Sequence, residues 1–297
     1  MKHLISLQDF SQKEILELIE LANKFIDEEG NIKSESIFPD KRILTLFCEP
    51  STRTKISFEI AAKSLGCHVI NFDASNSSLS KGETLQDTVD TLAQMDIDLC
   101  VLRHSDAVIE DLINHIRKPM TFVSAGEGAF SHPTQGLLDL MTIHQHKGLE
   151  NLNILIVGDL DHSRVYQSFT DGIKHFNSSV TLCGHPDLCT KADSSKLKYE
   201  SDLDKAIEGK DIIMALRIQH ERMDGQIDHI SYIEDYQVNE QRLQKANPNA
   251  ILMHPGPVNQ GIEITEAVYK SKQSVILDQV ANGVAMRMAI LTKYLSQ

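Results

Sequence analysis

The stretch Arg42–Thr54, RILTLFCEPSTRT, passes from an apolar segment into a polar loop. Arg42–Cys48 has the short apolar run of a buried strand, and Ile56 and Ile60 continue at helical spacing after the loop. A strand, a polar loop and a helix in this order are typical of a parallel α/β unit. Because ligands bind at the carboxyl ends of the strands in such sheets, the loop Glu49–Thr54 is a candidate site.

The same alternation recurs along the chain. Further strands are predicted at His68–Phe72, Leu99–Arg103, Met120–Ser124, Asn153–Val157, Val180–Cys183, Asp211–Leu216 and Ala250–Met253, and a last helix at about Asp278–Tyr294. The pattern pauses near Lys147–Asn151 and then restarts. We therefore expect two doubly wound parallel-sheet α/β domains, residues 1–147 and 148–283, with the C-terminal helix, about 284–297, packing back on the first.

Composition excludes several classes of function. Lys+Arg 29 against Asp+Glu 42 gives a formal net charge of -13, which disfavours general nucleic-acid binding. No apolar run reaches the ~18–20 residues of a membrane span, and the N-terminus turns polar too early for a secretory signal. The 5 cysteines, without C-x-x-C, favour free thiols and a cytoplasmic location. The chain lacks a Walker A motif, a dinucleotide fingerprint and H-E-x-x-H spacing, so we expect no cofactor and no metal.

Seven polar loops follow predicted strands or enter predicted helices. They are Glu49–Thr54, Ser77–Glu83, Arg103-His104, His132–Gln135, Gly158–Arg164, Arg217–Arg222 and His254–Pro257. Hydroxyls, helix N-termini and arginines suit phosphate and carboxylate groups. Each loop alone also fits a capped helix or a solvated turn, but seven at the predicted sheet ends favour a binding site.

Together these segments resemble the aspartate/ornithine transcarbamoylase family over the whole chain. The matching segments, in family order, are FCEPSTRTKISFE, SSLSKGETLQDT, LRH, SHPTQGLLDL, GDLDHSRV, LRIQHERM, MHPGPVNQGIEI and QVANGVAMRMAIL. Ornithine-specific members carry H-C-L-P in place of His254–Pro257 and an Asp/Ser-Met-Gly loop in place of Arg217–Gln219. Both differences favour aspartate, whose carboxylates need arginines.

The resemblance implies a role for each matching residue. Carbamoyl phosphate would be held by Ser51, Thr52, Arg53, Thr54, Arg103, His132, Gln135, Gly256 and Pro257, with His132, Arg53, Thr54 and Arg103 catalytic. Aspartate would be held by Lys81, Arg164, Arg217 and Gln219, and the loop with Ser78 and Lys81 would come from the neighbouring subunit of a homotrimer. The sequence departs from many relatives at Gln260, where they have arginine, and in its short Ser78–Lys81 loop.

The implied reaction transfers the carbamoyl group of carbamoyl phosphate to the α-amine of L-aspartate. It yields N-carbamoyl-L-aspartate and phosphate, an early step of de novo pyrimidine biosynthesis. A different amino acceptor such as ornithine, a non-catalytic assembly subunit and a nucleotide-binding module remain as alternatives. The sequence leaves open whether a regulatory chain or a dihydroorotase is a partner.

Overall fold

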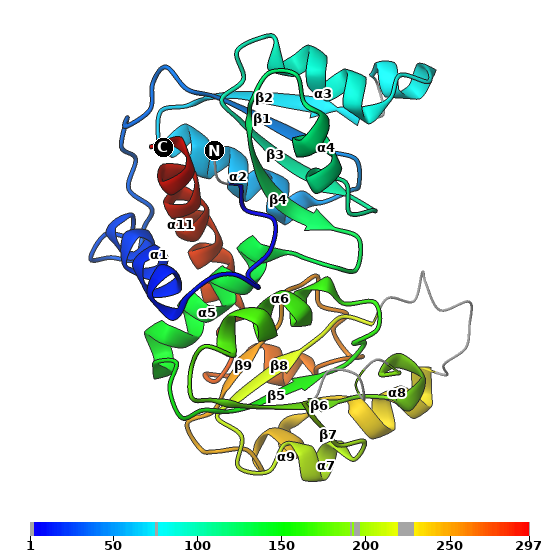
Figure 1. Cartoon of the computed structure of the whole chain (residues 1–297). Coiled ribbons are helices and arrows are strands. Elements are labelled where there is room, and N and C mark those ends of the chain that lie inside the picture. The colour runs from blue at the N-terminus through cyan, green and yellow to red at the C-terminus, as the bar shows by residue number, and fades with distance from the viewer. Residues whose placement is uncertain (1–2, 75–76, 191, 193–196, 219–228, 297) are drawn as a thin grey trace. The chain divides into compact units, whose positions relative to one another are not determined.

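A computed structural model describes residues 3–74, 77–190, 192, 197–218 and 229–296. The chain forms two compact units: unit 1, Met1–Met141 with Val280–Gln297, and unit 2, Thr142–Gln279. The boundary falls within two long helices, α5 (Pro133–Lys147) and α11 (Ile276–Leu295). The prediction of α/β architecture with parallel sheets and flanking helices is confirmed (Figure 1).

Unit 1 contains a parallel four-stranded sheet in the order β2-β1-β3-β4. Besides its parts of α5 and α11, this unit consists of α1 (Gln12–Lys24), β1 (Arg42–Phe47), α2 (Thr52–Ser64), β2 (His68–Asp73), η2 (Ser78–Lys81), α3 (Leu85–Ala93), β3 (Leu99–His104), α4 (Ile109–His115) and β4 (Thr121–Glu127). Right-handed crossovers place α2 on one face of this sheet and α3 and α4 on the other, because the chain reverses direction after β2. The buried core of the second face joins Leu44 and Leu46 of β1 to Val89 of α3 and Leu112 of α4.

Unit 2 contains a parallel five-stranded sheet in the order β7-β6-β5-β8-β9. Its elements are β5 (Asn153–Val157), α6 (Arg164–Ile173), β6 (Ser179–Cys183), η3 (Pro186–Leu188), β7 (Lys198–Tyr199), α7 (Leu203–Ala206), β8 (Ile212–Ala215), α8 (His229–Tyr236), α9 (Glu240–Leu243), β9 (Ile251–Met253) and α10 (Glu266–Tyr269). The central strands β5 and β8 are buried along nearly their whole length, as strands covered on both faces are. The two-residue β7 is polar and was not predicted.

Candidate active site

In unit 1 the direction in which the chain adds strands to the parallel sheet reverses between β1 and β3. The chain goes from β1 outward to β2, then returns to the other side of β1 for β3, so the connections after these neighbours leave in opposite directions. Ligands bind at such switch points in open parallel sheets. Phe47 pairs with Arg103 in register, and the Cys48 N–H donates to the Arg103 carbonyl at 2.9 Å. The structure therefore brings Arg103 beside the loop Glu49–Thr54.

The loop after β1 ends at the N-terminus of α2. Ser51 is the N-cap, and its hydroxyl makes no capping bond within the helix. Thr54 is buried, whereas Thr52 and Arg53 are exposed. The first turn of the helix thus offers hydroxyls and backbone N–H groups at the positive end of the helix dipole, an arrangement that suits a phosphate group.

The guanidinium of Arg103 is held in place by two neighbours. Its Nη1 donates to the Ala125 carbonyl of β4 at 3.1 Å, and its Nε lies 3.4 Å from the Glu49 carboxylate. The Arg103 side chain is only 12% exposed. Sequence reasoning did not single out Glu49 as a site residue, although it lies in the same polar loop. These contacts fix the direction of a cation at the switch point.

His132 and Gln135 lie where the connection from β4 enters α5. The buried His132 immediately precedes the helix, and its carbonyl accepts the Gln135 N–H at 3.0 Å. The Gln135 side-chain amide donates to Asp139 Oδ1 at 2.9 Å, one turn further along. Asp139 was also not singled out, although the i, i+4 spacing of Gln135 and Asp139 is a recognisable signal.

A buried carboxylate fixes the same connection from its other end. Glu127 Oε1 accepts the N–H groups of Val108 and Ile109, at 2.8 and 2.9 Å, and so caps the start of α4. Burial raises the pKa of Glu127 above its ordinary value, and the bonds from Ile109 and Val108 oppose this shift. Glu127 therefore ties the segment leading to His132 to a neighbouring helix.

Arg287 of α11 contacts both site-bearing helices. Its guanidinium lies 5.0 Å from the ring centre of Phe58 in α2, and Nη2 is 3.5 Å from Thr134 Oγ1 in α5. Nη1 donates to the Gly283 carbonyl at 2.9 Å, and a Cβ at Gly283 would lie 2.7 Å from that nitrogen. Burial lowers the pKa of Arg287 to about 10, although the Asp139 carboxylate opposes the shift. Arg287 thus links α11 to the two helices that begin at the switch point.

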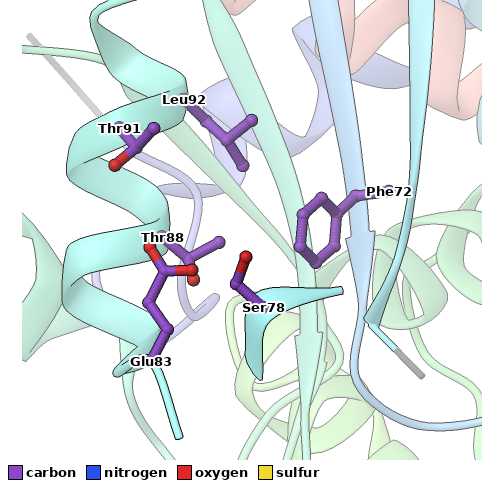
Figure 2. Close-up of a pocket in the computed structure, with 6 residues that line it drawn as sticks. All are labelled: Phe72, Ser78, Glu83, Thr88, Thr91 and Leu92. Atoms are coloured by element: carbon purple, nitrogen blue, oxygen red, sulfur yellow. The ribbon is translucent and has the colours of Figure 1, made fainter. Parts of the chain in front are cut away.

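Ser78 and Lys81 lie elsewhere in unit 1, in η2 after the edge strand β2. Lys81 is exposed, and η2 follows β2, which β1 separates from β3, the strand that carries Arg103. Ser78 borders a pocket of about 190 Å³ between η2 and α3 (Figure 2). The pocket is lined by Phe72, Ser78, Glu83, Thr88, Thr91 and Leu92. These six residues include no basic side chain, so the pocket by itself does not suit an anion.

Unit 2 has its own switch point, between β5 and β8. Leu216 follows β8 and donates its N–H to the Val157 carbonyl at 2.7 Å. Gly158, at φ +135°, permits this approach, because a Cβ there would lie 2.7 Å from the Leu216 carbonyl oxygen. The loops carrying Arg164 and Arg217 follow these two strands, and both arginines are partly buried. Two cations therefore belong to one switch point, as a dicarboxylate requires.

Arg164 begins α6, after a turn organised by Asp159. The buried Asp159 carboxylate accepts the His162 N–H at 3.2 Å and lies 2.9 Å from His162 Nδ1. Ser163 is the N-cap of α6. The Asp159–His162 turn thus fixes the loop from which Arg164 leaves.

His254–Pro257 follow β9, the strand beside β8. His254 is buried, and its Nδ1 accepts the Gly256 N–H at 2.8 Å. The Gly256–Pro257 peptide bond is cis. Gly256 and Pro257 belong to unit 2 and follow a strand at the same sheet edge as Arg217. Gln219, the remaining predicted site residue, lies outside the described residues.

Membrane helices and metal clusters are both missing from the described part of the chain. No helix there is long and apolar enough to cross a membrane. Within the same residues, no group of three or more His, Cys, Asp and Glu side chains could hold a metal ion.

Two models of protein families match the chain in succession. Residues 2–145 match the aspartate/ornithine carbamoyltransferase carbamoyl-P binding domain, and residues 150–294 match the Asp/Orn binding domain. An aspartate carbamoyltransferase catalytic subunit from Roseiflexus sp. (strain RS-1) is 43% identical over 98% of this chain and 94% of the relative. One from Dehalococcoides mccartyi (strain CBDB1) is 40% identical over 97% of this chain and 90% of the relative.

Solved structures give the same relationship. Aspartate transcarbamoylase from Trypanosoma cruzi, in complex with carbamoyl phosphate and aspartate, superposes with a TM-score of 0.85 at 30% identity, covering 98% of this chain and 94% of that one. Ornithine carbamoyltransferase from Pyrococcus furiosus has a TM-score of 0.82 at 27% identity, covering 98% and 96%. Successive matches to both family domains, with relatives aligned over nearly their full length, show that this chain belongs to the aspartate/ornithine carbamoyltransferase family.

Proposed function

We propose that this chain transfers the carbamoyl group of carbamoyl phosphate to the α-amine of L-aspartate, giving N-carbamoyl-L-aspartate and phosphate in pyrimidine biosynthesis. The observation that carries the proposal is the pair of arginines, Arg164 and Arg217, on the two loops of the unit 2 switch point. Aspartate presents two carboxylates, which arginines bind well, whereas the side-chain amine of ornithine would need an acidic partner. Family membership and the names of the relatives support the same reaction.

The residues of unit 1 suit carbamoyl phosphate. In the proposal, the hydroxyls of Ser51, Thr52 and Thr54, the N-terminus of α2 and the Arg53 guanidinium hold its phosphate. Arg103 reaches both the phosphate and the carbonyl oxygen. These cations form a local positive region in a chain of formal net charge -13, which favours encounter with anionic substrates.

The chemical step then depends on positioning and electrostatics. The deprotonated α-amine attacks the carbamoyl carbon, and negative charge grows on the carbonyl oxygen. His132, Thr54 and Arg103 would donate to that oxygen, while Gln135 and the backbone at Gly256 and Pro257 orient the carbamoyl amide. The tetrahedral intermediate collapses as the C–O bond to phosphate breaks, and the amine loses a proton. Preorganised donors of this kind accelerate the reaction by stabilising the charge that develops in the transition state, without a covalent protein intermediate.

The proposal includes a homotrimer with shared sites and domains at 1–147 with 284–297 and at 148–283. Lys81, with Ser78, would reach the aspartate site of a neighbouring copy, consistent with its exposure and its place after the edge strand β2. Ile56 and Ile60, one turn apart on α2, are 50% and 44% exposed, an apolar pair suited to contact between copies. Because its cysteines are free thiols, we place the protein in the cytoplasm. The proposal does not specify whether a regulatory chain or a dihydroorotase binds to it.

A carbamoylation assay with aspartate and ornithine side by side tests the reaction. We expect N-carbamoyl-L-aspartate and phosphate in equal amounts, and no turnover of ornithine. Arg217→Ala should raise the KM for aspartate much more than the KM for carbamoyl phosphate. Carbamoylation of ornithine alone would overturn the proposal, and equal damage to both KM values would overturn the assignment of Arg217.

A further inference from the structure

Glu263 is a buried carboxylate that joins two loops of unit 2. Its side chain is only 1% exposed, and it lies just before α10. Oε1 accepts the backbone N–H of Ile218 at 2.9 Å and the side-chain amide of Asn259 at 2.7 Å. Oε2 accepts the backbone N–H of Asn259 at 2.7 Å. Three donors therefore converge on one carboxylate.

The donors come from the loops that carry proposed substrate ligands. Ile218 directly follows Arg217 on the loop after β8, and Asn259 lies two residues beyond Pro257 on the loop after β9. The Asn259 amide also donates to the Ile218 carbonyl at 3.3 Å, and His254 Nε2 lies 3.6 Å from Glu263 Oε2. Both backbone polar groups of Ile218 are thus held by this cluster.

We propose that Glu263 is a positioning residue that fixes the backbone beside Arg217, and so sets the affinity of the site for aspartate. This inference rests on the proposed function. A carboxylate can accept several bonds at once, whereas an amide in its place would turn an NH₂ group toward at least one of the three donors. The loop would then shift, and displacements of about 1 Å can cost on the order of 10²-fold in rate.

Glu263→Gln preserves shape, but it replaces one of the two acceptor oxygens by an NH₂ group and removes the charge. We expect its KM for aspartate to rise by about tenfold, because at least one N–H donor of the cluster that holds Ile218 and Asn259 loses its partner. The dissociation constant of carbamoyl phosphate, measured without aspartate, should change by less than about threefold, since its proposed side-chain ligands all belong to unit 1 and only the backbone at Gly256 and Pro257 belongs to unit 2. The melting temperature is measured for each variant.

Asp211→Asn is the matched control. Asp211 precedes β8, at the opposite end of the same strand, and its carboxylate accepts the Asn153 N–H and the Asn247 side-chain amide. This variant should lower the melting temperature to a similar degree and leave the aspartate KM unchanged. A Glu263→Gln enzyme whose aspartate KM rises no more than that of the control would overturn the inference alone. A wild-type chain that does not carbamoylate aspartate would overturn the proposed function and the inference with it.

Asn259→Ala decides the question if Glu263→Gln does not fold. It removes the side-chain bonds to Glu263 and to the Ile218 carbonyl, but leaves the two backbone bonds to the carboxylate. The aspartate KM should rise by a smaller factor, about threefold, with carbamoyl phosphate binding unchanged. An unchanged aspartate KM in this variant would also overturn the inference.

Discussion

Two proposed ligands of unit 1, Arg103 and Gln135, are bonded to the core through their side chains, whereas in unit 2 the backbone on both sides of Arg217 is bonded to the core. Arg103 is bonded to Ala125 and paired with Glu49, and Gln135 is bonded to Asp139. In unit 2, the backbone N–H groups on either side of Arg217 donate to Val157 and to Glu263.

Because of this difference, a substitution of a substrate ligand is expected to affect the stability of the chain differently in the two units. A substitution at a ligand of unit 1 removes a structural contact together with a substrate contact. A substitution at Arg217 leaves the bonds of the flanking Leu216 and Ile218 N–H groups in place, because these groups donate to Val157 and Glu263. We therefore expect a substitution at Arg103 to lower stability more than a substitution at Arg217 does.

The largest effect is expected at Arg287, which is 3% exposed and contacts α2 and α5. Arg287→Met keeps most of the volume but leaves the fully buried Asp139 without its nearby cation. Removing one member of a buried ion pair costs about 3–5 kcal/mol, which is the upper bound for two groups that interact electrostatically. Urea denaturation of the purified chain should show a loss of up to this size in the free energy of unfolding.

The double variant Arg287→Met/Asp139→Asn is the control. Asparagine can still accept the Gln135 amide and carries no charge, so the double variant should be more stable than Arg287→Met alone. If both variants lose the same stability, Arg287 contributes through packing on Phe58 and not through charge. Charge would then not be what stabilises the contact between Arg287 and the helices α2 and α5, which carry proposed ligands.

A paired substitution, Arg103→Lys against Arg217→Lys, tests the comparison directly. The planar guanidinium of Arg103 contacts Ala125 and Glu49 at once, whereas the single ammonium group of a lysine cannot reproduce both contacts. Arg103→Lys should therefore lower kcat on the order of 10²-fold and also lower the melting temperature. Arg217→Lys should raise the aspartate KM by about tenfold with little change in melting temperature. Steady-state kinetics and thermal denaturation of the same preparations measure both. Equal losses of stability in the two variants would contradict the distinction between the units.

The alternation of short apolar runs and amphipathic stretches was sufficient to predict the fold class. Strands such as Arg42–Phe47 and Asn153–Val157 are apolar because both faces of a parallel sheet are covered, and this signal is local. The position of the polar loops was also predictable, because the carboxyl ends of parallel strands lie at one edge of the sheet. The strand β7, Lys198–Tyr199, is too short and polar to produce a pattern.

The residues that support the site were harder to predict. Arg287 lies 153 residues from its contact Thr134, and Glu263 lies 45 residues from Ile218, so no periodicity relates them. A buried acidic residue leaves only an indirect trace, such as Glu263 between Ile262 and Ile264. Which polar group it holds depends on strand order, which a single sequence does not specify.

The smallest expected effect concerns Glu127, the buried carboxylate that caps α4 and holds the segment before His132. Burial raises its native pKa above the ordinary value of 4.5. The native state therefore holds this proton more tightly than the unfolded chain. The resulting stabilisation is complete below the ordinary pKa and is lost as the pH rises through the native pKa. The loss amounts to about 1.4 kcal/mol for each pH unit that separates the native pKa from the unfolded pKa.

Glu127→Gln isolates this contribution, because its amide oxygen can still accept the Val108 and Ile109 N–H groups but does not ionise. The wild-type free energy of unfolding minus that of the variant should fall as the pH rises from the ordinary pKa through the native pKa of Glu127 and then level off. Taking the difference cancels the opposite trend of surface carboxylates such as Glu59 and Asp204, whose pKa values are lowered by lysine partners. Urea denaturation at several pH values provides the measurement, with Glu127→Ala, which loses both cap bonds, as the control. A difference that rises with pH would mean that the two N–H donors outweigh burial and stabilise the anion, and that unit 1 holds the segment before His132 by charge.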